Sequence, residues 1–511
     1  MIIMKKLLVL SLFSLFLFNC SEKEKTHQKP NIIYFLADDL GYGEIGVLGQ
    51  EKIKTPNIDA LAKGGMLFTQ HYSGAPVCAP ARYSFLTGKH MGHSYIRGND
   101  EWAERGEVWN YTKAFSDPGL EGQRPIPANT ITLGKQLQKA GYRTGIFGKW
   151  GLGAPSTEGV PSKQGFDDFY GYNCQRQAHN LYPSHLWHND TKVFLDNELV
   201  NPGSNLEKDA DINDPKSYAR FTQQNEYAPE LIHQKSLEFI KQHKDKPFFM
   251  YYASPLPHVP LQVPTKYTDE YRKVFGDEKP YTGKSYFPTQ HPNATYAAMI
   301  TYLDMQLGEL IAELKKQGIY ENTLIVFTSD NGPTYTGGVD ANYFDSAKPF
   351  DNNYGRTKGF VYEGGIRVPL IASWPKQIKA GTTSNHISAF YDMMPTFSDI
   401  AGIASPKEID GISFKNSLLG NNQQKHDYLY WEFPSYQGQQ AVRMGKWKAI
   451  RKNIFKGNLK LELYNLEEDV KEQNDVSSQF PEIVKKMEAI LIKEHVPAEN
   501  DRFKFKQLGD K

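Results

Sequence analysis

The chain has 511 residues, and its 59 Lys and Arg residues against 58 Asp and Glu residues give a formal net charge of +1. This length allows two to four domains at roughly 150 residues each, with a core that needs no disulfides or structural metal. The balanced charge lacks the clustered basic excess of a nucleic-acid-binding protein, so we expect no nucleic-acid partner.

The first residues have the pattern of a targeting segment. A short basic region is followed by an apolar run over residues 7–18, which then meets Cys20. The run is shorter than the roughly 20 residues that span a bilayer, but it suits a secretory signal. Leu17 and Cys20 resemble the lipidation site of a bacterial lipoprotein.

We therefore predict a lipoprotein signal peptide over residues 1–20 and a polar linker over 21–29. The expected location is the periplasm or outer membrane of a Gram-negative bacterium, with a lipid on Cys20 as the only membrane attachment. Asn19 stands where Gly or Ala is usual in lipoproteins, so the alternative is an ordinary signal peptide whose cleavage removes Cys20.

Cysteine is rare in this chain: only Cys20, Cys78 and Cys174 occur. After export the protein could form one disulfide at most, so it is not a disulfide-stabilised scaffold. Cys78 is then either a buried structural thiol or a residue with a chemical role.

Apolar runs alternate with amphipathic segments along the chain, which favours an α/β fold. Strands are predicted over 32–37, 248–253 and 324–328, with a further strand that ends at Lys149.

Helices are predicted between these strands. One covers 57–62 after Pro56, and a second begins at the cap Thr130 and ends at Gly141. A long helix over 296–316 carries an apolar stripe at helical spacing, which we interpret as core: Ile300, Leu303, Leu307, Leu310, Ile311 and Leu314.

Polar groups follow the carboxyl ends of four predicted strands. They are Asp38 and Asp39, Lys149, His258, and Asp330 with Asn331. Ligands of open α/β sheets bind at that edge. Each case alone could be a turn residue, but four together predict a site.

Four of these residues offer only oxygen donors that suit a hard cation: Asp38, Asp39, Asp330 and Asn331. Such donors fit Ca²⁺ or Mg²⁺, and Ca²⁺ accepts the looser geometry. No histidine adjoins Asp330, which argues against zinc. The alternative is that these residues only cap and turn, since Asp-Asn-Gly is a strong turn signal.

The stretch "PVCAPARYSFLTG" predicts a helix that begins near Cys78 and is ended by Gly88. Free N–H groups at a helix start attract anions, and such positions lower the pKa of a thiol. With Arg82, Lys149 and Lys358 nearby, we expect a cationic cup around an oxyanion.

Cys78-Ala-Pro80-Ala-Arg82, followed by Leu-Thr-Gly, resembles the signature of the type I, formylglycine-dependent sulfatases. Further blocks follow in the order of that family: "NIIYFLADDLGYGEIGVLG", "TPNIDALAKGGMLFTQHYS", "GIFGKWGLG", "HVPLQVP", "TSDNGP" and "GRTKGFVYEGGIRVPLIASWP". The resemblance covers residues 30 to about 402, and "LELYNLEEDVKEQNDVS" resembles the small second domain of the family.

The resemblance implies an alkaline-phosphatase-like α/β fold, with a mixed, largely parallel sheet flanked by helices over residues 30–424. A smaller C-terminal subdomain, an antiparallel sheet plus a helix, is expected over 425–511.

The resemblance also implies a sulfate-ester hydrolase with a modified residue. A formylglycine-generating or anaerobic sulfatase-maturating enzyme would convert Cys78 to formylglycine (3-oxoalanine), whose hydrate is the nucleophile. The residue-78 oxygen would join the four oxygen donors around Ca²⁺. Lys149 and Lys358 would neutralise the sulfate charge, Arg82 would orient the nucleophile, and His258 would protonate the leaving group.

One position departs from the family pattern. Many members have a histidine that contacts the formylglycine at the position of Gly151. His179 or another loop histidine is the expected substitute.

A segment over 167–190, rich in aromatics, His and Arg, is interpreted as a loop that rims the pocket, although an ordinary connection is an equal alternative. The predicted substrate contacts are Arg176, His179, His185 and Trp187, with Arg97, Asn99, Trp431 and Glu432 as weaker candidates.

"GKWGLG" together with "GYNCQRQAHNLYPSHLW" resembles glycan sulfatases of gut and marine bacteria. The expected substrate is sulfated galactose or N-acetylgalactosamine in a host or algal glycan. Two alternatives stay open: a phosphonate or phosphodiester hydrolase of the same superfamily, and a glycan-capturing lipoprotein without catalysis. Asp330-Asn331 points away from the first, and the intact charged set points away from the second.

Overall fold

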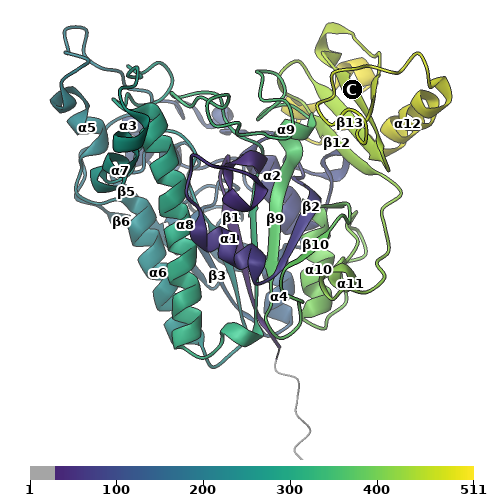
Figure 1. Cartoon of the computed structure of the whole chain (residues 1–511), viewed down its shortest axis with the longest axis horizontal. Coiled ribbons are helices and arrows are strands. Elements are labelled where there is room, and N and C mark those ends of the chain that lie inside the picture. Colours follow the sequence, from purple (N-terminus) through teal and green to yellow (C-terminus); the bar gives the residue numbers. More distant parts are fainter. Residues whose placement is uncertain (1–28) are drawn as a thin grey trace, which may run out of the picture.

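The computed structural model describes residues 29–511. The predicted signal peptide, Cys20 and all of the linker except Lys29 lie outside the described residues. An 11-stranded sheet has helices on both faces, and a 4-stranded sheet lies beside it near the C-terminus (Figure 1).

Five parallel strands form the centre of the large sheet. In spatial order they are β8 (Thr323–Ser329), β1 (Asn31–Ala37), β7 (Phe248–Ala253), β3 (Arg143–Lys149) and β4 (Asp168–Tyr172). The four strands predicted from apolar runs are all among them, so the prediction of a largely parallel sheet is confirmed.

Shorter or antiparallel strands complete both edges. Beyond β8 lie β9 (Arg367–Ser373), β2 (Met66–Tyr72), β10 (Thr382–Ser384) and β11 (Ser388–Ala389). Beyond β4 lie β5 (His185–His188) and β6 (Thr191–Phe194), both antiparallel.

The interpretation of 167–190 as one loop is therefore wrong in part, because β4 and β5 lie within it. Its aromatic residues favour strands, and Gly171 pairs directly with Trp187 across the two. The irregular part is limited to the connection between these strands.

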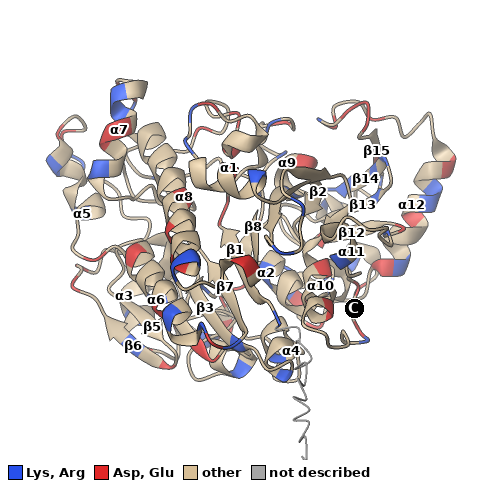
Figure 2. Ribbon diagram, turned by 60° about the horizontal axis from the view of Figure 1, so that its bottom comes forward, with Lys and Arg blue, Asp and Glu red and all other residues tan. Residues whose placement is uncertain are grey.

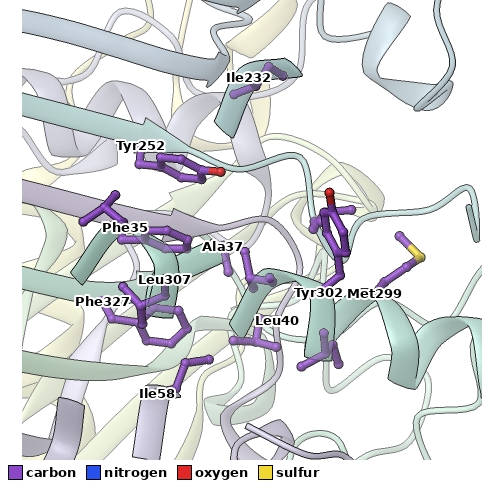
Figure 3. Packing of buried hydrophobic residues seen from close by; sticks show 14 of the residues in the cluster. Phe35, Ala37, Leu40, Ile58, Ile232, Tyr252, Met299, Tyr302, Leu307 and Phe327 are labelled. Atoms are coloured by element: carbon purple, nitrogen blue, oxygen red, sulfur yellow. The ribbon is translucent and has the colours of Figure 1, made fainter. Parts of the chain in front are cut away.

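The alternation of side chains along β1 divides the core in two. Ile33, Phe35 and Ala37 belong to the cluster packed under α8, and Ile32 and Leu36 belong to the cluster on the other face. Figure 3 shows the first cluster, in which the rings of Phe35 and Tyr252 stack with centroids 4.3 Å apart.

Helices cover each face of the sheet. One face carries α1 (Pro56–Lys63), α6 (Ala228–His243) and α8 (Pro292–Lys316), with α7 (Thr265–Phe275) against α8. The other face carries α2 (Cys78–Thr87), α4 (Leu133–Lys139) and α10 (Met393–Ile400). Short helices lie in the connections: α3 (Tyr111–Ser116), α5 (Ala219–Thr222), α9 (Glu363–Ile366) and α11 (Lys415–Leu418).

The predicted apolar stripe of the long helix is confirmed. Leu303, Leu307 and Leu310 are fully buried in the core, and Ile311 packs at its margin. Burying one such leucine contributes about 1.5–3 kcal/mol to folding, so this stripe strongly stabilises the packing of α8 against the sheet.

The predicted cap of α4 is wrong by two residues. Thr132 is the N-cap, and its side chain accepts a hydrogen bond from the backbone N–H of Lys135. Thr130 lies in the preceding turn, where its N–H donates to Pro127 O at 3.0 Å.

The C-terminal sheet is a four-stranded antiparallel meander. Its strands are β12 (Leu429–Phe433), β13 (Gln439–Met444), β14 (Trp447–Lys452) and β15 (Glu462–Asn465). Met487 and Leu491 of α12 (Pro481–Glu494) pack in the same cluster as Leu463 of β15. This is the predicted antiparallel sheet plus helix.

Acidic and basic residues are interspersed over the outer helices in Figure 2, which agrees with the net charge of +1. Within residues 29–511, no helix combines the length and the apolar character needed to cross a bilayer.

Candidate active site

The predicted meeting point of the strand ends is observed. β8, β1, β7 and β3 are adjacent and parallel, so their carboxyl ends open on one edge of the sheet. Asp38 and Asp39 follow β1, Asp330 follows β8, His258 follows β7, and Lys149 ends β3. Parallel topology thus assembles groups that lie up to 292 residues apart in the chain.

Cys78 is buried as the first residue of α2, and its Sγ lies 3.4 Å from Asp38 Oδ1. The expectation of a lowered thiol pKa is wrong. Burial raises the pKa of Cys78, and the negative charge of Asp38 raises it further, against the opposing effects of Lys149 and Lys358. The unmodified side chain is therefore a neutral thiol. Cys174 is also buried and free, so these two cysteines form no disulfide.

Two lysines approach the aspartates that follow β1. Lys149 Nζ lies 2.5 Å from Asp38 Oδ2, and Lys358 Nζ lies 2.6 Å from Asp39 Oδ2. Burial alone would raise the pKa of Asp38, but the positive charges of Lys149, Arg82 and Lys358 outweigh it and hold this pKa below its ordinary value. Asp38 is therefore a buried carboxylate anion.

Arg82 connects the two acid-bearing strands. Its guanidinium donates to Asp330 Oδ2 at 2.9 Å and lies 3.4 Å from Asp38 Oδ2. A further N–H donates to Lys149 O at 2.9 Å. The planar donor group thus fixes three elements at once, which suits a positioning role.

The oxygen donors fit a hard cation. Asn331 Nδ2 donates to Asp39 Oδ1 at 2.8 Å, whereas the buried Asn331 Oδ1 has no hydrogen-bond partner among the described residues. Burial and the nearby Asp38 raise the pKa of Asp330 to about 7, which reports crowded negative charge. An unpaired carbonyl oxygen beside crowded carboxylates is a set of ligands that Ca²⁺ satisfies.

Backbone geometry contributes to the same cluster. Asp39 is left-handed with φ of +66°, and its N–H donates to Asp330 Oδ1 at 3.1 Å. A non-glycine residue in this region costs of order 1 kcal/mol or more, and such strain gathers at functional sites. Ligand atoms of Asp38, Asp39, Cys78 and His258 all lie within 4.8 Å of one another.

Two histidines stack at the mouth of this cluster. The rings of His258 and His179 are 5.1 Å apart and nearly parallel, and Tyr286 meets both edge-on. His258 Nδ1 donates to Val259 O at 2.5 Å, which leaves Nε2 facing Asp39 Oδ2 at 3.6 Å. Burial and the charge of Lys358 lower the pKa of His258, so its ring is neutral.

Sequence reasoning missed Tyr286. It lies in an irregular segment between α7 and α8 that carries no recognised motif. The sequence shows only that Tyr286 is one of 30 tyrosines, and nothing in it distinguishes this tyrosine from the others.

Gly151 has φ of +72°, and a Cβ there would lie 3.0 Å from Gln175 Oε1. The side chain of Gln175 thus fills the space beside this glycine, and its Oε1 is buried without a partner among the described residues. His179, the expected substitute for a histidine at 151, lies at the site through its stack with His258.

Four predicted substrate contacts have internal partners instead. Arg97 pairs with Glu432, and Arg176 pairs with Glu101. His185 Nε2 and Trp187 Nε1 lie 3.0 and 2.6 Å from the same oxygen, Glu121 Oε1. All four are buried: Arg97, Arg176, His185 and Trp187. Their placement gives no support to a role in substrate contact, which stays a prediction.

Of the weaker candidates, Trp431 is buried and Asn99 is exposed. Trp431 Nε1 donates to Ser73 O at 2.8 Å inside the core. Asn99, in contrast, is exposed, and its Oδ1 accepts a hydrogen bond from Ala79 N at 3.2 Å. Asn99 therefore contacts the start of α2, one residue from Cys78, and is open to solvent.

Comparisons with known proteins agree with this geometry. The family model described as Sulfatase matches residues 30–403, and a model described as N-sulphoglucosamine sulphohydrolase, C-terminal, matches 354–496. The chain is 31% identical to N-acetylgalactosamine-6-sulfatase of Canis lupus familiaris over 83% of this chain and 72% of that protein. It is 27% identical to N-acetylgalactosamine-6-O-sulfatase of Bacteroides thetaiotaomicron over 91% and 93%.

Among solved structures, Ps i-CgsB superposes with a TM-score of 0.71 at 28% identity, over 92% of this chain and 94% of that one. The same holds for its complex with k-i-k-neocarrahexaose. Because the family model covers most of the described residues and the strand ends carry its charged groups, this chain belongs to the sulfatase family and is a sulfuric ester hydrolase.

Proposed function

We propose that the chain hydrolyses a sulfate ester on galactose or N-acetylgalactosamine within a host or algal glycan and releases inorganic sulfate. One observation carries the proposal. Cys78 lies at the start of α2 in a buried cluster that holds both crowded oxygen donors and two lysines. Relatives named as N-acetylgalactosamine-6-sulfatases, and a neighbour solved with a carrageenan fragment, support the choice of sugar.

The mechanism rests on a formylglycine at position 78 and on Ca²⁺ held by Asp38, Asp39, Asp330 and Asn331. When present, these groups supply an oxygen nucleophile and a Lewis acid for the sulfate group.

The side chains of the chain itself provide charge and orientation. Lys149 and Lys358 neutralise the negative charge of the bound sulfate group, an electrostatic contribution that is large in a buried site. Arg82 holds Asp330 and Asp38 in register through its guanidinium. Asp38, kept ionised by its cationic neighbours, accepts a hydrogen bond from the residue at position 78.

His258 is the proposed acid for the leaving group. A sugar hydroxylate is a poor leaving group without a proton. His258 is neutral in the structure because of burial and Lys358, with its Nε2 directed into the site. The negative charge of a bound sulfate beside this nitrogen favours the protonated ring, so substrate binding and proton supply are coupled.

We also propose that the protein is exported and carries a lipid on Cys20, and that a maturation enzyme modifies Cys78 before or during folding. Cys78 is buried in the folded chain, so modification after folding would require its exposure. Metabolic labelling with palmitate, compared between the parent and Cys20→Ala, tests the lipid, because only the parent should be labelled.

Sulfate release from a panel of sulfated galactose and N-acetylgalactosamine isomers tests the activity. The protein is co-expressed with a maturation enzyme and assayed in calcium, beside Cys78→Ala. Cys174→Ala is the matched control, because it removes the other buried free thiol. Release by the parent and by Cys174→Ala, but not by Cys78→Ala, supports the proposal and identifies the ring position.

Mass spectrometry of the peptide that contains residue 78 makes a negative result informative. Formylglycine at 78 with no release from any glycan, but with turnover of an aryl phosphonate in the same panel, would overturn the proposed substrate class. An unmodified Cys78 would instead show that maturation had failed in that preparation.

A further inference from the structure

Four aromatic side chains form a continuous row beside the loop that carries Lys358. We call Tyr335, Tyr354, Phe360 and Tyr436 the aromatic platform. Neighbouring ring centroids are 4.8 Å apart for Tyr335 and Tyr354, 5.7 Å for Tyr354 and Phe360, and 5.2 Å for Phe360 and Tyr436. The ring planes meet at 88°, 76° and 58°, so the row is not one flat surface and each ring presents its own face. Three of the four rings carry a hydroxyl group.

The platform adjoins the candidate active site. The ring of Tyr436 packs on Gly359, where a Cβ would lie 3.1 Å from its carbons. Gly359 follows Lys358 directly, and its N–H donates to Pro76 O at 2.8 Å, two residues before Cys78. The platform therefore begins one residue from Lys358 of the candidate active site.

Two parts of the chain are held together to build the row. Tyr335, Tyr354 and Phe360 come from the connection between β8 and α9, whereas Tyr436 comes from the hairpin between β12 and β13. Gln439 joins them: its Nε2 donates to Gly359 O at 2.8 Å, and its Oε1 accepts from Val361 N at 3.2 Å.

The outer rings face solvent although they are large and aromatic. Tyr354 is 70% exposed and Tyr436 is 48% exposed. Tyr436 and Gln437 are both left-handed, with φ of 49° and 72°. Two adjacent non-glycine residues in this conformation are strained, and such strain persists where the surroundings require it. The strained hairpin sets Tyr436 over Gly359 rather than into the core.

We propose that the aromatic platform is a carbohydrate subsite, which stacks pyranose rings next to the sulfated galactose or N-acetylgalactosamine. This inference rests on the proposed function and extends it from a sugar to a chain of sugars. The faces of tyrosine rings match the apolar C–H face of a pyranose, and their hydroxyls match its equatorial hydroxyl rim. The preferred substrate is then an oligosaccharide rather than a sulfated monosaccharide.

The rigidity of the row favours this use. Tyr436 also stacks on Phe433 of β12, with centroids 6.0 Å apart, so it is supported on two sides. An aromatic ring that is already fixed loses little conformational entropy on binding, and this keeps stacking favourable for weak sugar contacts.

The test compares substrates of different length in the holoenzyme. Tyr354→Ala and Tyr436→Ala are assayed on tetrasaccharides of chondroitin 6-sulfate and of κ-carrageenan, on the matching sulfated monosaccharides, and on 4-nitrophenyl sulfate. We expect a fall in kcat/KM of roughly tenfold or more on the cleaved tetrasaccharide, mainly through KM. Activity on the monosaccharide and on the aryl sulfate should stay within about twofold.

Two further variants control for structure. Phe194→Ala removes an equally exposed ring, 77% exposed on β6 at the far edge of the sheet, and should change none of the activities. Tyr436→Trp keeps a stacking face and should retain most of the activity on the tetrasaccharide. Equal losses on all substrates, or no loss on the tetrasaccharide, would overturn the proposal.

A binding measurement separates failure of the subsite from failure of the proposed function. Calorimetry with Cys78→Ala measures the affinity for the two tetrasaccharides without turnover. Binding that Tyr354→Ala weakens supports the platform even if no sulfate is released. Absence of binding of both tetrasaccharides overturns the platform as a subsite for galactose-type glycans.

Discussion

Within residues 29–511, two clusters of histidine, cysteine and acidic side chains bring possible metal ligands within 4.8 Å of one another. One consists of Asp38, Asp39, Cys78 and His258, and we call it, together with the adjacent Asp330 and Asn331, the cup. The other consists of His90, His93 and Asp410, and we call it, together with Glu494, which accepts a hydrogen bond from His90, the histidine clasp. They look alike by residue type and spacing, yet their hydrogen bonds differ in a way that decides what each can bind.

In the histidine clasp, the ring nitrogens of His90 and one nitrogen of His93 are already used. His90 Nδ1 accepts from Gly92 N–H at 3.1 Å, so its Nε2 carries the proton and points to Glu494 Oε2 at 3.1 Å. His93 Nδ1 lies 2.8 Å from Asp410 Oδ1. A protonated nitrogen cannot ligate a metal, so this cluster is a polar link between the loop after α2 and helix α12.

In the cup, one buried acceptor oxygen receives no hydrogen bond from the described residues. Asn331 Oδ1 is buried and has no hydrogen-bond partner among the described residues, and burial together with the nearby Asp38 raises the pKa of Asp330 to about 7. The comparison shows that proximity of ligand atoms is a weak criterion for a metal site. Buried oxygen lone pairs that receive no hydrogen bond are a stronger criterion for a metal site. Leaving such lone pairs unpaired is costly unless a cation binds there.

The largest effect should come from removing a cup ligand. Asp39→Ala should lower sulfate release by at least about a hundredfold, because it removes an oxygen donor and the partner of Lys358. It should also abolish the rise in melting temperature that calcium gives the parent, measured by differential scanning fluorimetry. His93→Ala, which removes a side chain of the histidine clasp, should keep the full calcium-induced rise in melting temperature. An equal loss of this rise in Asp39→Ala and His93→Ala would contradict the assignment of the calcium site to the cup alone.

The next effect concerns the proton supplied by His258. His258→Ala should lower the rate on a sugar sulfate by about a hundredfold, but that on 4-nitrophenyl sulfate by less than about tenfold, because an activated phenolate leaves without a proton. The ratio of the two losses is the measurement. Equal losses on both substrates would contradict the role of His258 as an acid.

A smaller effect is expected from the clasp on stability. Glu494→Ala removes the acceptor of His90 Nε2–H and of Tyr428 Oη, which donates at 2.7 Å. The free energy of unfolding should fall by about 1–3 kcal/mol, measured by denaturant titration. Calcium binding should be unchanged, and Lys486→Ala, an exposed residue on the same helix, provides the control.

The smallest effect is a pH dependence of the clasp. A hydrogen bond to Asp410 raises the pKa of His93 above 6.5, against burial and Lys89, with Glu494 adding to the rise. A raised pKa gives stability that is complete below the unfolded value and is lost as the pH rises through the folded value. The stability difference between the parent and His93→Gln should therefore shrink between about pH 6 and pH 8. A stability difference that grows over this pH range would contradict a raised pKa of His93.

Much of the fold was predictable because its signals are local. The apolar runs that became β1, β7 and β8 are continuous, and the stripe of α8 repeats at helical spacing. The position of the charged groups then followed from parallel topology, which joins strand ends whatever their separation in the chain.

The rest depended on contacts that no local pattern reports. The thiol pKa at Cys78 is raised because burial and Asp38 outweigh the helix start. Arg176 and Trp187 have the composition of a binding loop but find internal acids, Glu101 and Glu121. Tyr436 escaped notice because its partner Gly359 lies 77 residues earlier, and only the fold brings the two together.

The hydrogen bonds of Gln439 to the loop of Lys358 have a consequence for how such enzymes diverge. Asp38, Asp39, Lys149, Asp330 and Asn331 lie at strand ends, where an insertion would disturb the sheet itself. The hairpin 434–438 lies outside that framework: Tyr436 contacts Gly359, and the backbone carbonyls of Gln437 and Gly438 accept hydrogen bonds from the 454–455 segment. If the aromatic platform binds sugars as proposed, a change in the sequence of this hairpin would alter which glycan binds without touching the charged groups at the strand ends.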